Sequence, residues 1–287
     1  MAKTTLGIIG GSGFYQMPGL ERTEQLDLTT PFGKPSDTFH RGMIGQVAVV
    51  FLSRHGRGHR LLPSEVNYRA NVFGMKQLGV EYLVSVSTAG SMKDELKPGD
   101  LVVPDQFVDR TFKRPATFFG NGIVVHVSLA DPVCRELGRA LSEAGRAAGG
   151  NIREGGTYIC IEGPQFSTRA ESNLYRNWGV DVIGMTAMQE ARLAREAELC
   201  YATLVLVTDY DCWHQSVQAV DIAEILRVMT MNVELAQMTV ANLARALAGR
   251  ERRCACGDAL KDTIITDRSL IAPKMAADLS PILGKYL

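Results

Sequence analysis

Short apolar runs rich in valine and isoleucine recur along the chain, and none shows the polar alternation of a strand with one face in water. Each run therefore predicts a buried strand. The runs cover residues 6–10, 47–52, 82–90, 100–105, 155–163 and 200–209. Between them, apolar residues at helical spacing predict helices over 65–79, 131–148, 169–179, 188–199 and 221–247. This alternation predicts an α/β fold whose central sheet is covered on both faces.

No repeat, low-complexity stretch or Ser/Gly-rich linker divides the 287 residues. A chain of this length can bury one large core. We therefore expect residues 1–250 to form a single α/β domain. Residues 251–287 are expected to be a polar C-terminal extension of that domain.

Composition narrows the range of partners. Lys plus Arg and Asp plus Glu number 31 each, so the formal net charge is zero, which gives a nucleic acid or an anionic membrane no electrostatic basis for binding. No segment approaches the roughly 20 apolar residues of a membrane span. The N-terminus enters a predicted strand directly, unlike a signal peptide. We expect a cytoplasmic protein that binds small molecules.

The segment "LGIIGGSGFY" at 6–15 resembles the start of a dinucleotide-binding domain. That motif needs G-x-G-x-x-G opening a helix. Gly11 and Gly13 supply the first two glycines, but Gln16 takes the place of the third, and Pro18-Gly19 prevents a regular helix. We therefore disfavour an NAD site. A glycine turn carrying the Ser12 hydroxyl suits a smaller anion.

Other predicted strand ends carry groups that bind anions. "SRHGRGHR" at 53–60 places Arg54 and His55 directly after a strand, and "SVSTAGS" at 85–91 ends another strand in hydroxyl residues. Thr186 precedes a predicted helix, whose N-terminal N–H groups favour negative charge. Ligands of open α/β sheets gather at the carboxyl ends of strands. No P-loop is present, so these groups point to free phosphate rather than a nucleoside triphosphate.

Two further segments could contact an organic substrate. "VTDYDCW" at 207–213 places Asp209 and Asp211 on one face of an extended segment. No set of metal ligands accompanies them, and a capped turn with two solvated acids is an equal alternative. A carboxyl group beside an apolar wall can instead donate a proton to a leaving group. In "YICIEGPQFSTRAE", Phe166 and Ser167 could contact a base, although a lone aromatic residue is usually part of the core.

The cysteines give no disulfide framework. Cys254 and Cys256 form a C-x-C pair, and the other four cysteines are scattered singly. As a zinc half-site this pair lacks a second pair, so we predict no metal. Free thiols are favoured over a strained disulfide between the two.

Six motifs in order resemble the trimeric purine nucleoside phosphorylase family, in particular its members that cleave 5′-methylthioadenosine. They are "GIIGGSGFY", "RHGRGHRLLPSEVNYRAN", "DQFVDRTFKRPATFF", "ICIEGPQFSTRAES", "GMTAMQEARLAREAELCYA" and "TDYDCW". The resemblance spans about residues 6–250. It implies a single domain with a mixed central sheet flanked by helices, and a pentosyltransferase that assembles as a homotrimer, or as a hexamer. The tail resembles C-terminal extensions of some archaeal and bacterial members.

The implied reaction splits methylthioadenosine with inorganic phosphate into adenine and 5-methylthioribose 1-phosphate, without metal or organic cofactor. Asp209, aided by Asp211, would protonate N7 of the base and bond its amino group. Phosphate would be bound by Ser12, Arg54, His55, Ser87, Thr88 and Thr186. The nucleoside would contact Met185 at the ribose, Phe166 and Ser167 at the base, and His59, Ile222, Ile225 and Leu226 at the methylthio group, with His126 donated by a neighbouring subunit.

Asp209 bears on the choice of substrate. In the family that the sequence resembles, enzymes that act on 6-oxopurines carry Asn at this position, so Asp favours 6-aminopurines. Gly184 stands where relatives often have Asn, and Gln189 stands where they have Pro, so methylthioinosine or another 6-oxopurine nucleoside is an alternative substrate. A non-catalytic nucleoside-binding protein and an NAD-dependent oxidoreductase are the alternatives from other classes.

Overall fold

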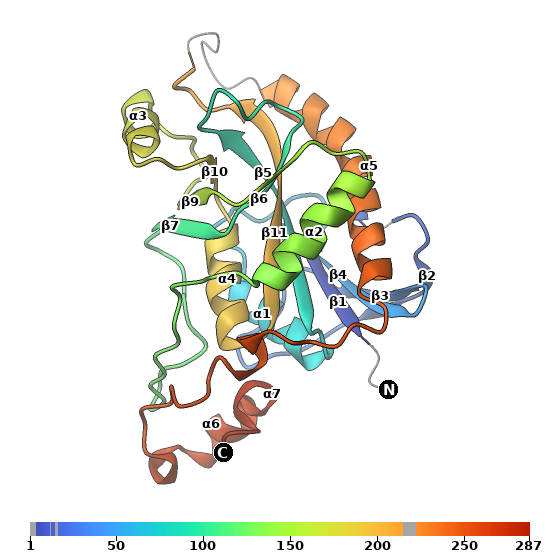
Figure 1. Cartoon of the computed structure of the whole chain (residues 1–287). Coiled ribbons are helices and arrows are strands. Elements are labelled where there is room, and N and C mark those ends of the chain that lie inside the picture. The colour runs from blue at the N-terminus through green and yellow to red at the C-terminus, as the bar shows by residue number, and fades with distance from the viewer. Residues whose placement is uncertain (1–3, 12, 15–16, 215–221) are drawn as a thin grey trace.

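The structure, a computed structural model, describes residues 4–11, 13–14, 17–214 and 222–287, and only the backbone of residues 222–227 and 229–231. Alternating strands and helices form a mixed sheet flanked by helices (Figure 1). The strands are β1 (Thr5–Gly10), β2 (Glu21–Leu26), β3 (Phe39–Ile44), β4 (Val47–Ser53), β5 (Tyr82–Ser91), β6 (Leu101–Val103), β7 (Gln106–Arg110), β8 (Ile152–Glu154), β9 (Thr157–Ile161), β10 (Val182–Gly184) and β11 (Cys200–Tyr210). The helices are α1 (Tyr68–Gln77), α2 (Arg135–Ala147), α3 (Arg169–Asn177), α4 (Ala187–Glu196), α5 (Ile222–Ala246), α6 (Pro273–Asp278) and α7 (Ser280–Leu283).

Strand β5 is the centre of the sheet. The main path runs β2-β3-β4-β1-β5-β10-β9-β7, and β11 pairs with the other edge of β5 and continues through β6 to β8. The pairs β4–β1, β1–β5 and β5–β11 are parallel, whereas β10 pairs with β5 antiparallel. The carboxyl ends of β1, β4, β5 and β11 therefore lie at the same end of the sheet.

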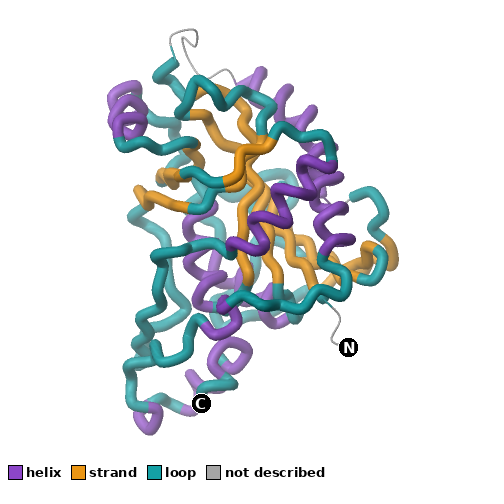
Figure 2. The backbone as a smooth tube through the Cα atoms, in the orientation of Figure 1, coloured by secondary structure: helices purple, strands orange, loops and turns teal. Residues whose placement is uncertain are grey.

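Helices cover both faces of the sheet (Figure 2). From β5, Val84 and Val86 pack into a core cluster with residues of α2 and α5, and Leu83 packs into a second cluster with residues of α1 and α4. Strands with apolar residues on both faces need this double cover. The predicted fold class is confirmed, and the six predicted strands and five predicted helices are all present with shifted ends.

The strands that the sequence did not reveal are short or polar. β2 reads ERTEQL and is exposed along most of its length because it lies at a sheet edge. β8 and β10 have three residues each. β10 is buried but too short to show as an apolar run, whereas β2 and β8 are ordered mainly by pairing with a neighbouring strand.

The expectation of a polar C-terminal extension is wrong. The second core cluster, around α1 and α4, includes five buried apolar residues of the extension, namely Leu260, Ile271, Leu279, Ile282 and Leu283. Two of them lie in the short helix α7 and the other three lie in turns and bends, so no hydrophobic period revealed them. A single buried carboxylate on the domain, Glu198, holds the extension through Leu260 N–H (3.0 Å), the Tyr286 hydroxyl (2.5 Å) and Lys285 (2.8 Å).

The described part of the opening loop does not start an α-helix, although Gly13 and Phe14 have 3₁₀ geometry. After β1, Phe14 is buried and stacks on Phe51 with ring centroids 6.0 Å apart. Residues 17–20 form a turn before β2. This arrangement lacks the helix N-terminus that a dinucleotide pyrophosphate requires. Among the described residues, no helix combines the length and apolarity needed to cross a membrane.

Candidate functional site

Arg54 is fixed where β4 leaves the sheet. Its backbone N–H donates to Gly10 at the end of β1 (2.9 Å), and its side chain is 3 % exposed. The guanidinium donates to Ser85 Oγ (2.8 Å) and to three further acceptors, the carbonyl oxygens of Ile9 and Val86 and the Glu190 carboxylate. Of the five guanidinium N–H groups, four meet these acceptors. The second N–H on Nη1 has no partner among the described residues and remains for a ligand.

The partner of Arg54 is Glu190 on α4, which is fully buried. Nε of Arg54 lies 2.5 Å from Oε1 and Nη2 lies 3.1 Å from Oε2, a bidentate pair. Burial alone would lower the pKa of Arg54, but the Glu190 carboxylate raises it above its usual value. Arg54 therefore stays charged in an interior site. Glu190 was not among the predicted site residues, although it lies in the "GMTAMQEA" motif.

Three of the predicted phosphate residues come together beside this pair. Ser87 Oγ lies 3.3 Å from Thr186 Oγ1, and Ser87 directly follows Val86, whose carbonyl accepts from Arg54. Thr186 is the N-cap of α4 and makes no side-chain capping bond. Hydroxyls beside a helix N-terminus form an anion-binding arrangement. Thr88, half-buried, is next in β5.

His55 is half-buried beside Arg54, and its ring stacks on the exposed His59 ring with centroids 4.3 Å apart. Burial and the Arg54 charge lower the pKa of His55 to about 4. The Nδ1 atom lies 2.8 Å from the Leu61 carbonyl oxygen. We infer that the neutral ring donates from Nδ1, which leaves Nε2 as an acceptor for the proton of a monohydrogen phosphate.

The two acids at the end of β11 differ in their surroundings. Asp211 is 3 % exposed and accepts from the Ser172 hydroxyl at 2.5 Å. Asp209 accepts from Thr208 Oγ1 at 2.7 Å through Oδ1, and its Oδ2 has no partner among the described residues. Burial raises the pKa of both acids, and Asp211 adds to the effect on Asp209. Asp209 is therefore the acid with a free oxygen, and Asp211 is held by α3.

The predicted base-binding segment lies next to these acids. The Cys212 thiol donates to the Ser167 carbonyl at 3.3 Å, which joins the segment to the residue after Asp211. Ser167 Oγ is inaccessible to water and has no partner in the described chain, whereas Phe166 is half exposed. Met185 packs its sulfur against Gly163, where a Cβ would lie 2.5 Å from that sulfur.

A second buried arginine, Arg114, joins several of these segments and was missed by sequence reasoning. Its guanidinium donates to the Met185 carbonyl, to Gln189 Oε1 (3.0 Å) and to Glu162 (3.2 Å to Oε1). It also reaches the Tyr68 hydroxyl at 3.3 Å. Arg114 thus sets the backbone before α4. The only signal was its place in the "DRTFKRPATFF" motif.

The two departures from the family pattern have structural partners. A Cβ on Gly184 would lie 2.7 Å from Cζ of Tyr158, a fully buried residue whose hydroxyl fills the remaining space. Gln189 is 1 % exposed, accepts from Arg114, and donates to Thr111 Oγ1 at 2.6 Å. Both residues are therefore built into the packing around the site.

Some predicted residues are not joined to this group. His126 is exposed, and its backbone N–H donates to Thr263 of the extension at 3.0 Å. No contact between His126 and the strand-end residues is found in the described chain. Ser12 lies outside the described residues, as do the side chains of Ile222, Ile225 and Leu226.

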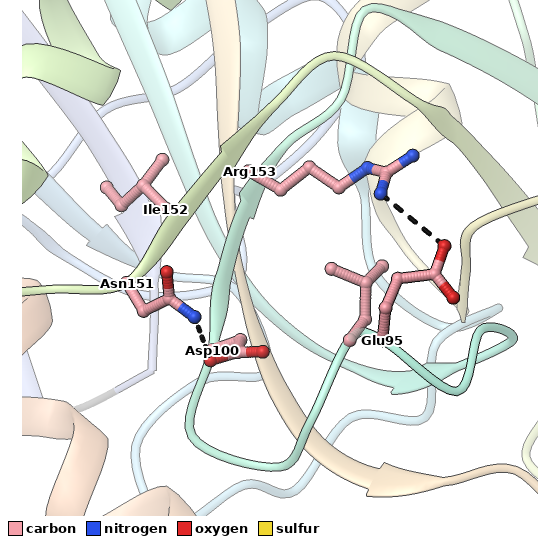
Figure 3. Close-up of a pocket in the computed structure, with 6 residues that line it drawn as sticks. Glu95, Asp100, Asn151, Ile152 and Arg153 are labelled. Atoms are coloured by element: carbon pink, nitrogen blue, oxygen red, sulfur yellow. Dashed lines mark hydrogen bonds and ion pairs between the residues drawn. The ribbon is translucent and has the colours of Figure 1, made fainter.

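A surface pocket lies apart from the strand-end residues (Figure 3). Its polar groups already pair with one another. Arg153 forms an ion pair with Glu95 at 3.7 Å, and Asn151 donates to Asp100 at 2.7 Å.

The expectation that Cys254 and Cys256 lack a second cysteine pair is wrong. Cys134 and Cys200 lie beside them, and the four sulfur atoms are all within 4.8 Å of one another. Cys134 and Cys200 are far in sequence from each other and from the C-x-C pair, so no local spacing motif could show this arrangement.

The sequence and the fold can now be compared with known proteins. The family model of the phosphorylase superfamily matches residues 5–245. S-methyl-5′-thioadenosine phosphorylase of Geobacter sulfurreducens is 53% identical over 283 residues, which cover 98% of this chain and 99% of the relative. The enzyme of the same name from Koribacter versatilis is also 53% identical, over 98% of this chain and 96% of the relative.

Solved structures agree. A methylthioadenosine phosphorylase from an Antarctic soil metagenomic library is 45% identical with a TM-score of 0.94, covering 99% of this chain and 100% of that one. The Schistosoma mansoni methylthioadenosine phosphorylase in complex with adenine is 34% identical with a TM-score of 0.86, covering 93% and 100%.

The match over residues 5–245 shows that the chain belongs to the phosphorylase superfamily. Its place within the superfamily follows from the full-length relatives, which carry the name S-methyl-5′-thioadenosine phosphorylase. The predicted family membership is confirmed.

Proposed function

We propose that the protein is a pentosyltransferase that converts S-methyl-5′-thioadenosine and phosphate into adenine and 5-methylthio-α-D-ribose 1-phosphate. Full-length identity to enzymes of that name supports this reaction. The observation that carries the choice of base is Asp209, a carboxyl group of raised pKa with one oxygen free of partners. A protonated carboxyl can donate to N7 of adenine while its other oxygen accepts from the 6-amino group.

The phosphate and base groups lie at a suitable separation. The Asp209 carboxylate lies against Gly90 of β5. Gly90 is three residues from Ser87, or about 10 Å along an extended strand. Phosphate held by Ser87, Thr186 and the free N–H of Arg54 would face C1′ of a nucleoside whose base reaches Asp209. Ser12 and Thr88 complete the proposed phosphate site, and the ribose lies against Met185.

In this mechanism a phosphate oxygen forms the new bond to C1′ as the bond from C1′ to N9 breaks. The electron pair of that bond passes to the purine, which takes the Asp209 proton at N7 and leaves as neutral adenine. The protein lowers the barrier by holding the phosphate in line and by neutralising charge on the base. Asp211 and Ser172 act as positioning residues, because their bonds to each other fix the end of β11. Phosphate is thus a co-substrate.

The test is phosphate-dependent cleavage of three nucleosides, namely methylthioadenosine, methylthioinosine and inosine. We expect adenine release from methylthioadenosine at a rate at least about 100-fold above base release from the other two nucleosides. A 6-oxopurine presents the wrong hydrogen-bonding pattern to the site and leaves its buried polar groups unsatisfied. Faster cleavage of methylthioinosine would replace our substrate with the 6-oxopurine alternative. Release of adenine without phosphate would contradict the reaction type.

We further propose that the active assembly is a homotrimer in which His126 completes a neighbour's methylthio pocket, together with that neighbour's His59, Ile222, Ile225 and Leu226. The exposed position of His126, away from its own strand-end residues, supports this arrangement. Co-expressing His126→Ala and Asp209→Asn chains should restore activity, because mixed trimers contain sites with both native residues. Mixtures no more active than either variant would refute the shared site, and light scattering gives the subunit number.

A further inference from the structure

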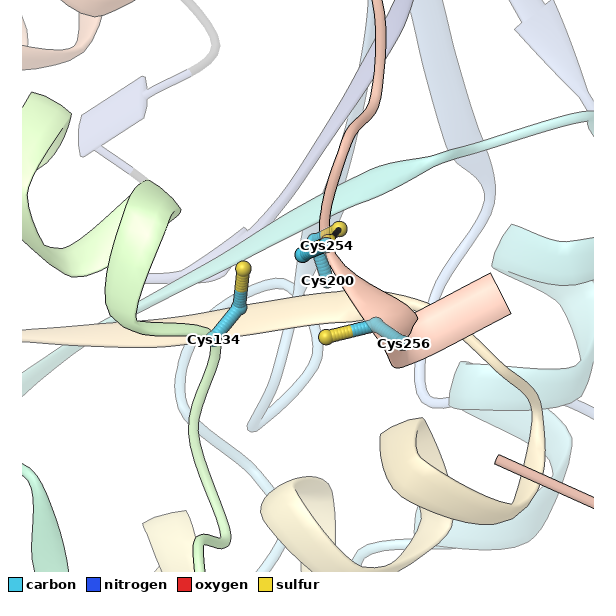
Figure 4. Close-up of side chains that lie close together, drawn as sticks. All are labelled: Cys134, Cys200, Cys254 and Cys256. Carbon is cyan, nitrogen blue, oxygen red and sulfur yellow. Dashed lines mark hydrogen bonds between the residues drawn. The ribbon is translucent and has the colours of Figure 1, made fainter. Parts of the chain in front are cut away.

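The four-cysteine cluster (Cys134, Cys200, Cys254 and Cys256) lies at the opposite end of β11 from the acids (Figure 4). All four Sγ atoms lie within 4.8 Å of one another, and those of Cys200 and Cys254 are 3.2 Å apart. Cys134, Cys200 and Cys256 are buried in the core, while Cys254 is partly exposed. Solvent therefore reaches the cluster mainly at Cys254.

The fold holds two of these residues in place. Cys134 is the N-cap of α2, and its backbone N–H donates to Tyr201 at 2.8 Å. Cys200 begins β11, and its N–H donates to Glu81 at 2.9 Å. The domain therefore presents one cysteine pair, and the start of the extension brings the other.

The surroundings suit negative charge on sulfur. Nη1 of Arg195 lies 3.9 Å from the Cys256 sulfur. The Arg252 guanidinium packs against Gly257, the residue that follows Cys256. Two guanidinium groups gain nothing from four neutral thiols, but they would balance four thiolates around a divalent cation, which together form a dianion.

We propose that the four-cysteine cluster binds one divalent metal ion, zinc, in a tetrahedral structural site. Zn–S bonds of about 2.3 Å place the four sulfurs about 3.8 Å apart, within the range that the cluster spans. This compact set fits one ion rather than a multi-iron cluster, and four thiolates select zinc among the available divalent ions. Each thiol releases its proton as the metal–sulfur bond forms, and no electron is transferred.

The site would join the extension to the domain. Cys254 and Cys256 open the extension, and residues further along it pair with the segment that carries His126. Ile265 N–H donates to Val124 at 2.9 Å, and His126 N–H donates to Thr263 at 3.0 Å. A metal ion bound by Cys254 and Cys256 before Thr263 and by Cys134 after His126 therefore restrains both chain segments that form this contact.

The first test is metal content. The full chain, purified without chelator or metal-affinity resin, should contain one zinc per chain by mass spectrometry. Growth in cobalt-containing medium should give the visible absorption bands of a tetrahedral cobalt tetrathiolate. Cys134→Ser and Cys254→Ser should reduce the metal content to background. Cys212→Ser, a cysteine outside the cluster, should retain it.

The second test is hydrogen exchange of the intact chain before and after zinc removal under reducing conditions. We expect faster exchange over residues 251–266 and 123–127, with α3 unchanged. If the serine variants do not fold, the cobalt spectrum of the native sequence decides. The proposal is overturned if the reduced, folded protein takes up no zinc or cobalt, or if alkylation and mass spectrometry show disulfides within the cluster as purified.

Discussion

Glu190→Gln tests whether the buried ion pair with Arg54 is the main electrostatic element of the anion site. The substitution keeps the shape of the side chain and removes its charge. Arg54 is 3 % exposed and Glu190 is fully buried, so the guanidinium would be left charged in the interior with only neutral acceptors. Breaking a buried pair in this way costs about 3–5 kcal/mol. For a chain of this size, that corresponds to a fall in Tm of about 6–20 °C.

The same helix offers a matched control. Glu196 is 6 % exposed and has no arginine partner among its hydrogen bonds, which come from Thr117 and the Phe118 N–H. Burial raises the pKa of Glu196 to about 7, so its folded form already tolerates the neutral state. We expect Glu196→Gln to cause no loss of stability at pH 7, and to raise the free energy of unfolding by up to about 3 kcal/mol, because the neutral side chain avoids burying a carboxylate.

The assay is thermal unfolding of the three proteins with and without phosphate. In Glu190→Gln, phosphate would supply the charge that Arg54 has lost, so the gain in Tm on adding phosphate should exceed that of the native protein. Equal losses of Tm in the two glutamine variants would refute the role of the ion pair. A phosphate effect no larger than in the native protein would place the ligand away from Arg54.

Further expectations concern Asp209, Gly184 and Glu196. Asp209→Asn should lower kcat/KM for methylthioadenosine about 10²–10⁴-fold, the usual contribution of general acid catalysis, and should relatively favour methylthioinosine. Because the pKa of Asp209 is raised, native kcat should fall as pH rises through that value, and a pH profile unchanged in the variant would rule out this proton donor. Gly184→Ala should destabilise the fold by about 1–3 kcal/mol in denaturant titrations through overlap with Tyr158. The pKa of Glu196 is about 7 in the folded protein against 4.5 in the unfolded chain. Protonation of Glu196 therefore stabilises the fold by about 3 kcal/mol, a contribution that is complete below pH 4.5 and is lost as pH rises through about 7. Glu196→Gln should remove that pH dependence, which unfolding at several pH values measures.

Apolar runs and strand ends revealed the sheet and much of the candidate site. Arg54, Ser87 and Asp209 follow or end strong β-strands, and the carboxyl ends of parallel strands meet at one edge. Their partners were not visible in the same way. Glu190 lies 136 residues from Arg54, and it occupies a helix position that would suit a solvated acid equally well. Only the packed fold shows that this carboxylate is inside.

The extension and the cysteines show a different limit. A C-x-C pair was visible in the sequence, but Cys134 and Cys200 reach it only because α2 and β11 start side by side. Likewise, Leu260 and Ile282 follow no period, because the segments that carry them conform to a surface already formed by α1 and α4. Hydrophobic periodicity reveals regular helices and strands. It gives no signal for irregular segments that become ordered by packing against the rest of the domain.

The bonds to Glu198 have a consequence for the order in which the chain is made. Leu260, Lys285 and Tyr286 follow this carboxylate by 62 to 88 residues, so they are synthesised well after it. During translation the rest of the domain can collapse while the carboxylate still lacks these partners. Pairing of Glu198 is therefore a late step in the folding of the chain. A nonsense mutation at codon 285 would remove the Lys285 and Tyr286 contacts and leave this buried acid with the Leu260 N–H.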